Sequence, residues 1–230
     1  MAKEYAVTVS EVREWADGIK SIFFSFNGER MPYKAGQYVL LKAIISGREV
    51  SRAYSLASVP NDENLEIIIR VVGEFTQYLN TLKVGDALKL IGPFGHFTLD
   101  LCKGKNVVFV ATGTGISPLL GMARELHKSG GCKRFESITM VYGTRYKDML
   151  VYREELEQHE RECPNFRFVP VLSREENWAG RKGYVQGVVS EIAAPDTDYF
   201  ICGLPAMTDE VEKILLERGI KRELIHLERY

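Results

Sequence analysis

The spacing of apolar residues changes once along this sequence, near residue 105. Before that point, short runs of strand type alternate with turns such as Asp17-Gly18 and Asn61-Asp62. After it, apolar runs alternate with stretches of helical period. A chain that changes its period in this way is expected to form two different architectures in succession.

The first hundred residues predict a small antiparallel barrel, because closely spaced strands joined by tight turns are typical of that fold. One helix is expected at residues 76–82, with Thr76 as the residue that caps its first turn. The expected strands are residues 5–9, 19–25, 38–44, 53–58, 65–71 and 87–91.

The rest of the chain predicts a parallel sheet covered by helices on both faces, since its strand and helix patterns alternate. We therefore predict two domains, residues 1–102 and 103–230, with the functional site in the cleft between them. The expected strands are residues 107–111, 137–142, 166–172 and 198–202, and the expected helices are residues 118–128, 150–160 and 207–218.

Composition excludes several classes of function. The 30 basic and 31 acidic residues give a net charge of −1, which provides no field for holding nucleic acid. No apolar stretch is long enough to span a membrane or to form a signal core, so we expect a cytoplasmic protein. The four cysteines lie far apart in the sequence, which disfavours a metal site or an iron–sulfur cluster. Redox chemistry would therefore need an organic cofactor.

A glycine-rich turn, Ala111-Thr-Gly-Thr-Gly-Ile-Ser-Pro118, follows an expected strand and opens an expected helix. Glycines at such a turn let a phosphate or a flat ring approach the backbone closely. Ser117 is expected at the helix cap and Pro118 in the first turn. The turn is not a G-x-G-x-x-G fingerprint, and by itself it also fits a tight turn without a ligand.

Two segments of the first half have side chains suited to a dinucleotide. Arg52-Ala-Tyr-Ser55 places Arg52 and Tyr54 on one face of a strand and Ser55 on the other. A guanidinium suits a pyrophosphate, and a tyrosine ring suits stacking on a heterocycle. Gly73-Glu-Phe-Thr76 precedes a helix whose N-terminus favours an anion. Taken singly, the two segments fit an edge strand and a capped surface helix equally well.

The order of the motifs is more specific than any one of them. They are R-x-Y-S, G-x-x-T, K-V-G-D, G-P-F-G-H-F, T-G-T-G-I-S-P, V-Y-G-T-R and C-G-x-P-x-M. This series resembles that of the ferredoxin–NADP reductase family, from about Gly36 to Tyr230. The resemblance implies an antiparallel Greek-key FAD-binding barrel, followed by a Rossmann-like parallel sheet that binds a nicotinamide nucleotide.

The same resemblance implies roles in flavin binding. Arg52 would pair with the FAD pyrophosphate, Tyr54 would lie against the isoalloxazine, and Ser55 would hydrogen-bond at flavin N5. The other implied flavin contacts are Ala53, Ile69, Val71, Gly73, Phe75, Thr76, Thr114 and Tyr230.

For the nucleotide, Ser173, Arg174, Lys182 and Tyr184 match positions that hold the 2′-phosphate and adenine in NADP-using members. NADPH is therefore favoured over NADH as the substrate. Against this, W-x-G-x-x-G-Y-V also occurs in NADH-using relatives, and Arg174 has the alternative of pairing with Glu175 or Glu176. The other implied contacts are Gly113, Thr114, Gly115, Ile116, Tyr142, Gly143, Thr144, Arg145, Cys202, Gly203, Leu204 and Met207.

Four residues are expected at the reacting centre: Ser55, Cys202, Glu228 and Tyr230. The resemblance implies that Cys202 lies beside the nicotinamide, that Glu228 is a nearby carboxylate, and that Tyr230 is a movable gate over the flavin. Other interpretations of the same residues are a small buried side chain for Cys202 and a frayed tail for Glu228 and Tyr230.

The resemblance implies an FAD-dependent oxidoreductase that passes electrons between NADPH and a one-electron carrier, ferredoxin or flavodoxin. No ferredoxin-type cysteine cluster is present in the sequence, so we expect a separate acceptor. We also expect a monomeric protein. The alternatives are an NAD(P)H:flavin reductase with loosely bound flavin, an NADH-linked oxygenase reductase, and a flavin subunit of a larger complex. The anion seat at residues 73–76 favours tightly held FAD.

Overall fold

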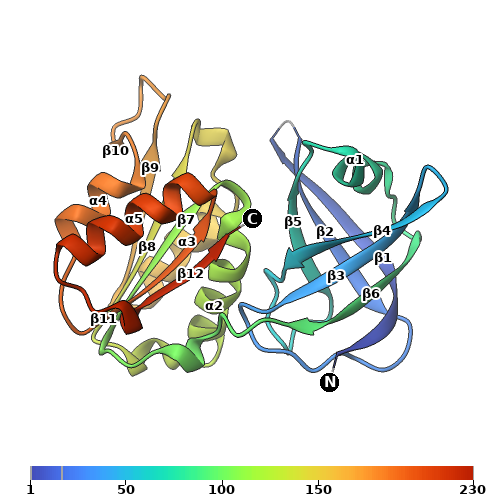
Figure 1. Cartoon of the computed structure of the whole chain (residues 1–230), viewed down its shortest axis with the longest axis horizontal. Coiled ribbons are helices and arrows are strands. Elements are labelled where there is room, and N and C mark those ends of the chain that lie inside the picture. Colours follow the sequence, from blue (N-terminus) through green and yellow to red (C-terminus); the bar gives the residue numbers. More distant parts are fainter. Residues whose placement is uncertain (1, 17, 230) are drawn as a thin grey trace.

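Two six-stranded sheets lie side by side in the computed structural model, which describes residues 2–16 and 18–229 (Figure 1). The first sheet is antiparallel and the second is parallel. Both predicted architectures are therefore confirmed. No helix in the described part of the chain is long and apolar enough to cross a membrane.

The antiparallel sheet curls into a barrel. Its strand order is β4-β3-β6-β1-β2-β5, and an isolated bridge between Leu56 and Ile67 links the two ends of that row. Alternate residues such as Val7, Ile22 and Leu41 point inward and are buried. The strands are β1 (Lys3–Ala16), β2 (Ile19–Phe26), β3 (Tyr38–Ile45), β4 (Arg48–Ser55), β5 (Leu65–Arg70) and β6 (Ala87–Phe94), and the barrel helix is α1 (Glu74–Thr81).

The parallel sheet has helices on both faces. Its strands, in spatial order, are β10 (Arg181–Lys182), β9 (Phe166–Leu172), β8 (Ser137–Thr144), β7 (Asn106–Thr112), β11 (Thr197–Gly203) and β12 (Ile225–Arg229). The helices are α2 (Ile116–Lys128), α3 (Arg153–Glu162), α4 (Val185–Ile192) and α5 (Pro205–Glu217), and short 3₁₀ turns lie at Leu99–Leu101, Gly113–Gly115, Gly131–Arg134, Lys147–Met149 and Arg222–Leu224. The chain reverses its direction across the sheet between β7 and β11, where parallel sheets bind ligands at the carboxyl ends of their strands.

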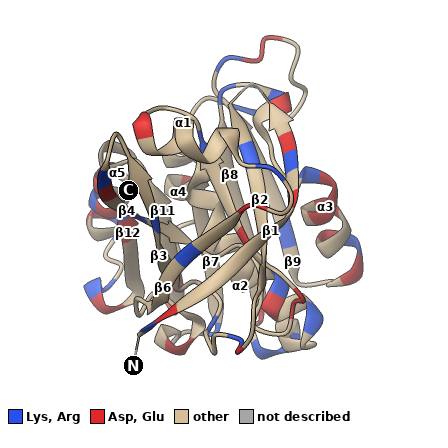
Figure 2. Ribbon diagram, turned by 90° about the vertical axis from the view of Figure 1, so that its right-hand side faces the viewer, with Lys and Arg blue, Asp and Glu red and all other residues tan. Residues whose placement is uncertain are grey.

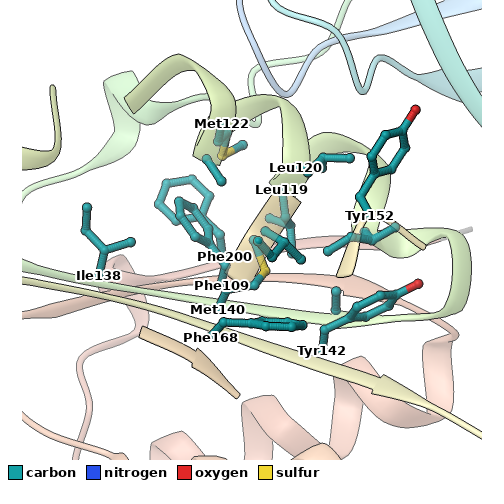
Figure 3. Packing of buried hydrophobic residues seen from close by; sticks show 14 of the residues in the cluster. Phe109, Leu119, Leu120, Met122, Ile138, Met140, Tyr142, Tyr152, Phe168 and Phe200 are labelled. Atoms are coloured by element: carbon teal, nitrogen blue, oxygen red, sulfur yellow. The ribbon is translucent and has the colours of Figure 1, made fainter. Parts of the chain in front are cut away.

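One apolar cluster is shared by the two sheets. Phe109, Leu119, Met140 and Phe200 form its centre, between α2 and the parallel sheet (Figure 3). The same cluster includes the barrel residues Ile19, Ala35, Ala57 and Ile68. The contact between the two halves is therefore a continuous part of the core.

The helix starts differ from their predictions. Gly115, and not Ser117, is the N-cap of α2; Ser117 lies inside the first turn, where its Oγ donates to the Thr114 carbonyl at 3.0 Å. The N-cap of α1 is Gly73, and Thr76 is the third helical residue. Its Oγ1 accepts a hydrogen bond from the Gly73 amide at 3.0 Å, so it satisfies the helix end from within the helix.

Three elements of the second sheet and its helices were not predicted: α4, β12 and the two-residue strand β10. α4 contains Gly187 and several β-branched valines, which are poor helix formers, so tertiary packing decides its conformation. β12 pairs in parallel with β11 and alternates its side chains. Ile225 and Leu227 pack into the cluster that includes residues of α4 and α5, while His226 and Glu228 project from the other face.

Candidate functional site

The end of β4 meets the end of β12 across the boundary between the two sheets. Ser55 Oγ donates a hydrogen bond to Glu228 Oε2 at 3.3 Å. Cys202 stands opposite Glu228 in the parallel register of β11 and β12. Three of the four residues expected at the reacting centre are thus brought together. The fourth, Tyr230, lies outside the described residues.

Burial controls the protonation of this centre. Burial raises the pKa of Glu228 to about 7, although the hydrogen bond from Ser55 opposes the shift. Both protonation states of Glu228 are therefore populated near neutral pH. Burial, together with the nearby Glu228, also raises the pKa of the Cys202 thiol well above its usual value. Cys202 is thus a neutral thiol beside a carboxyl group that can exchange a proton.

The outer part of β4 presents an aromatic surface next to a free cation. The ring of Tyr54 stacks on Phe75 of α1, with centroids 6.0 Å apart and planes inclined by 28°. Burial raises the pKa of Tyr54 to about 12, so its hydroxyl stays protonated. Arg52 is exposed, donates only to the neighbouring Ser51 carbonyl at 2.8 Å, and forms no ion pair with any described carboxylate. Its guanidinium is available to an anionic ligand.

The N-terminus of α1 forms an open seat beside this surface. A Cβ placed on Gly73 would meet no atom within 4 Å beyond its chain neighbours. The turn itself is fixed, because Thr76 Oγ1 accepts from the amides of Val72 and Gly73, both at 3.0 Å. A fixed turn with open space at its glycine fits a pyrophosphate. Of the other expected flavin contacts, Ala53 is exposed and Val71 is half-buried, whereas Ile69 is packed in the barrel core.

The glycine-rich turn after β7 touches the end of β11. Gly113 has a φ of 54°, a conformation that favours glycine. A Cβ on Gly115 would lie only 2.3 Å from the Cys202 carbonyl oxygen, and one on Gly203 would lie 2.4 Å from Thr112 Oγ1. Only glycines let these two turns approach so closely. The turn residue Thr114 is half-buried, Ile116 is buried, and Leu204 beyond β11 is 59% exposed.

A group of cations lies at the carboxyl ends of β8 and β9. The Arg174 amide donates to the Arg145 carbonyl at 2.9 Å, and the Ser173 amide donates to the Thr144 carbonyl at 3.0 Å. These bonds hold the two arginines side by side next to the Ser173 hydroxyl. Both arginines are exposed, and neither forms an ion pair with a carboxylate in residues 2–16 and 18–229.

The surroundings of these arginines bear on the alternative pairing of Arg174. Glu175 accepts a hydrogen bond from the Lys147 amide at 3.3 Å, and Glu176 contributes its carbonyl to Lys182 at 2.7 Å. Pairing of Arg174 with either glutamate is therefore not observed. Tyr184 is 72% exposed at the N-cap of α4, where its ring is free to stack on a ligand.

Other expected nucleotide contacts are buried, with Tyr142 in the apolar cluster shared by the two sheets and Met207 in the cluster beside α4 and α5. Tyr142 is buried and its hydroxyl donates to the Met149 carbonyl at 3.3 Å. Met207 is also buried, and Gly143 lies so close to α4 that a Cβ there would be 2.6 Å from Val185 Cγ1. These residues shape the floor of the site. No role was predicted for Asp198 or His226. The alternation of apolar and polar residues along residues 225–229 is the sequence signal that indicates a strand containing His226.

Comparison with known proteins agrees with this geometry. Residues 7–99 match the oxidoreductase FAD-binding domain, and residues 109–213 match the oxidoreductase NAD-binding domain. The chain is 33% identical over 243 residues to ferredoxin–NADP reductase B of Sorangium cellulosum, covering 100% of this chain and 98% of that protein. The chain belongs to the ferredoxin–NADP reductase family. It is an FAD-dependent oxidoreductase with a domain for a nicotinamide nucleotide.

Some similar proteins are longer than this chain, and others have about the same length. The phenol hydroxylase P5 protein of Acinetobacter pittii is 30% identical over 240 residues, which cover 100% of this chain and 66% of that protein. The crystal structure of Amycolatopsis cytochrome P450 reductase GcoB superposes with a TM-score of 0.88 at 30% identity, over 99% of this chain and 70% of that one. A ferredoxin NADP⁺ reductase from Neisseria gonorrhoeae shares the fold, with a TM-score of 0.85 at 23% identity over 99% of this chain and 98% of that chain.

Proposed function

We propose that this reductase passes electrons between NADPH and a one-electron carrier, ferredoxin or flavodoxin, by way of tightly bound FAD. The observation that carries the choice of NADPH is the pair of unpaired arginines, Arg145 and Arg174, beside Ser173. A 2′-phosphate needs cations and hydroxyl donors, whereas a free 2′-hydroxyl is usually met by a carboxylate. Lys182 and Tyr184 complete this subsite on the neighbouring turn.

The flavin site is proposed on β4 and α1. Arg52 pairs with the pyrophosphate over Gly73, Tyr54 stacks on the ring system, and Ser55 donates at flavin N5. When bound, FAD accepts two electrons as a hydride and releases them one at a time. Supporting contacts are proposed for Ala53, Ile69, Val71, Phe75, Thr76 and Thr114.

The nicotinamide site is proposed where the turns after β7 and β11 meet. Gly113, Gly115 and Gly203 let the nucleotide approach the backbone, with Thr114, Ile116 and Leu204 beside them. Cys202 packs as a neutral thiol, and the Glu228 carboxyl, hydrogen-bonded to Ser55 Oγ, would take up or release a proton as electrons pass. Tyr230 is proposed as the gate that leaves when the nicotinamide enters. The base of the nicotinamide site is proposed to consist of Tyr142, Gly143, Thr144 and Met207.

The proposed partner docks on a local patch of charge. Figure 2 shows ribbon segments of Lys and Arg (blue) interspersed with segments of Asp and Glu (red), so neither sign dominates this view. Mixed charge of this kind steers a partner only where a few like charges gather. We propose a monomer that meets its carrier transiently, with the domain boundary between residues 102 and 103.

A second candidate is an NADH-linked reductase component of an oxygenase. It is favoured by the 30% identity to the phenol hydroxylase P5 protein, which covers the full length of this chain. The two candidates differ in the nucleotide they use, and that difference is measurable on the purified protein.

The test begins with the absorbance spectrum of the desalted protein, followed by stopped-flow reduction with NADPH and with NADH. We expect a yellow protein that is reduced at far lower concentrations of NADPH. Equal responses to both nucleotides would favour the oxygenase reductase, and a colourless protein would favour a flavin reductase. Arg52→Ala should lose flavin on desalting, whereas Arg48→Ala, also an exposed arginine of β4, should retain it.

A further inference from the structure

A single buried carboxylate joins three segments of the second domain. Asp198, at the start of β11, is fully buried. Its Oδ2 accepts from the backbone amides of Lys103 at 2.8 Å and Gly104 at 2.6 Å, in the linker that arrives from the barrel. Its Oδ1 contacts His226 Nε2 on β12 at 2.8 Å. One side chain thus ties the linker, β11 and β12 together.

Asp198 acts here as an ionised acceptor. Burial opposes its ionisation, but the hydrogen bonds from His226 and from the Gly104 and Lys103 amides hold the pKa of Asp198 below its usual value. Because a carboxylate only accepts, His226 Nε2 carries the proton in this bond. The imidazole also packs on Phe200 of β11, with centroids 4.6 Å apart. The ring is therefore held both by a hydrogen bond and by packing.

β12 needs such an anchor because, among the described strands, it is the edge strand of its sheet and pairs only with β11. His226 stands opposite Phe200, and Glu228 stands opposite Cys202. Alternate residues of a strand share a face, so His226 and Glu228 lie on the same face, two positions apart. Holding His226 at its register position on β11 therefore also fixes the position of Glu228 along the strand direction relative to Ser55.

We propose that His226, held by Asp198, is a positioning residue that keeps β12 in register so that the Glu228 carboxyl faces Ser55. The inference rests on the proposed role of Glu228 at the reacting centre. It assigns a purpose to a buried histidine–carboxylate contact that the proposed function does not use.

The other charged and titratable groups around β12 do not provide this anchor. Cys102 and Lys103 of the linker lie next to Asp198, and the Lys103 ammonium pairs at the surface with Glu223 at 4.0 Å. Arg222, in the turn before β12, pairs with Glu212 of α5, and Arg229, at the end of β12, pairs with Asp209 and Glu212. Glu228 itself faces Ser55 and Cys202. Arg229 contacts α5 from the face of β12 opposite to His226 and Glu228, and the contact of Glu228 with Ser55 is the one that the anchor would position.

The proposal predicts a change in the titration of Glu228. Burial is what raises its pKa, so a loosened β12 should admit water and return the pKa toward its usual value. The direct measurement is a ¹³C NMR titration of the Glu228 carboxyl in the flavin-loaded protein, with its resonance assigned by its loss in Glu228→Gln. Hydrogen exchange of the amides of residues 225–229 reports the mobility of β12 independently of activity.

Four variants make the test specific. His226→Leu should lower the pKa of Glu228 by about 1 unit and accelerate exchange in β12. His226→Gln, whose amide can still donate to Asp198, should restore most of both properties. Asp198→Asn should shift both in the direction of His226→Leu, and it carries the test if the leucine variant does not fold. His127→Leu removes a similar histidine–carboxylate contact, with Glu162 at 2.7 Å on α2 and α3, and should change neither.

The two ideas fail in different ways. If the pKa of Glu228 and the exchange of β12 are unchanged in both His226→Leu and Asp198→Asn, the positioning role is wrong. The same holds if His127→Leu produces the same shifts. If Glu228→Gln leaves the pH dependence of flavin reduction by NADPH unchanged, the proposed role of Glu228 is wrong, whatever the NMR titration shows.

Discussion

Exposed arginines in this protein differ in whether they have a carboxylate partner. Arg181 pairs with Glu191 at 2.7 Å, whereas Arg145 and Arg174 nearby have no carboxylate partner among the described residues. Exposed ion pairs contribute only about 0 to 1 kcal/mol, so a missing pair is no structural deficit. The two unpaired guanidinium groups are available to a phosphate. Their charge-assisted hydrogen bonds to a phosphate are stronger than hydrogen bonds to a neutral hydroxyl.

The first prediction concerns this arginine pair. Arg174→Ala should raise the KM for NADPH about 10- to 100-fold, because a charge-assisted hydrogen bond contributes about 1.5 to 3 kcal/mol. The KM for NADH should change little. Arg167→Ala, an exposed arginine toward the other end of β9, is the matched control. If Arg174→Ala raises the KM for NADPH and the KM for NADH equally, Arg174 does not bind the 2′-phosphate.

The second prediction concerns Glu228 and stability. Its pKa is raised to about 7 in the folded protein, against 4.5 for the ordinary carboxyl, so the folded protein holds this proton more tightly than the unfolded chain. Stability from this group is complete below pH 4.5 and is lost as the pH rises through 7. Relative to the wild type, Glu228→Gln should therefore gain about 2 kcal/mol of unfolding free energy between pH 5 and pH 8.

Urea denaturation at several pH values measures this difference. Ser55→Ala removes the hydrogen bond to Glu228 but keeps the carboxyl group, so its stability should still decline with rising pH. A difference between Glu228→Gln and the wild type that is independent of pH would mean that Glu228 titrates at its ordinary value.

At the scale of elements, close contacts between turns set the geometry of the site. The turn before α2 passes over the end of β11 with no space for a side chain, and the Cβ that Gly115 lacks would meet a carbonyl oxygen. A backbone atom cannot rotate away as a flexible side chain would. The glycine-rich turn at residues 111–118 can therefore lie this close to Cys202 only because Gly115 has no side chain.

The third prediction follows from that contact. Gly115→Ala should lower the unfolding free energy by about 1 to 3 kcal/mol, the usual cost of overpacking, and should slow flavin reduction by NADPH. Gly187→Ala in α4 is the control, because a Cβ there would meet nothing within 4 Å. That variant should gain about 0.5 to 1 kcal/mol from higher helix propensity. Thermal unfolding and stopped-flow reduction of both variants measure the contrast.

At the scale of the whole molecule, a buried polar network joins the barrel to the second domain. Arg124 of α2 donates to Glu66 of β5 at 2.6 Å and to the Ala57 carbonyl at 2.8 Å. The same guanidinium donates to both oxygens of Glu155 on α3, at 2.6 and 2.8 Å. Tyr152 donates to Glu66 at 2.6 Å. The network and the shared apolar cluster together orient the glycine-rich turn at residues 111–118 relative to Ser55.

The fourth prediction tests this network. Glu66 is only 2% exposed, so Glu66→Gln leaves Arg124 partly uncompensated in the interior. We expect a loss of about 3 kcal/mol in unfolding free energy, as for other broken buried ion pairs. Lys3→Gln removes an exposed pair with Glu29 and should leave the unfolding free energy nearly unchanged. Equal costs in urea denaturation would mean that the Arg124 network does not hold the two halves together.

The sequence by itself determined the two architectures and their order. Strand alternation in the first half and strand–helix alternation in the second are local properties, because side-chain period follows backbone conformation. The same local reasoning located the glycine turn at residues 111–118 and the segments 52–55 and 73–76. It was wrong about Ser117 as a helix cap, because a 3₁₀ turn at Gly113–Gly115 leads directly into α2 and the helix begins at Ile116. It also did not find α4, β10 or β12.

Only the tertiary structure decided how these segments combine. Ser55 and Glu228 are 173 residues apart in the chain, and only the packing of the barrel on the parallel sheet brings them within hydrogen-bond distance. The raised pKa of Glu228 arises from burial, which no local pattern records. The partners of Arg124, Asp198 and His226 were likewise invisible in the sequence. Long-range contacts follow from the whole set of packed surfaces, whereas period and turn chemistry follow from neighbours in the chain.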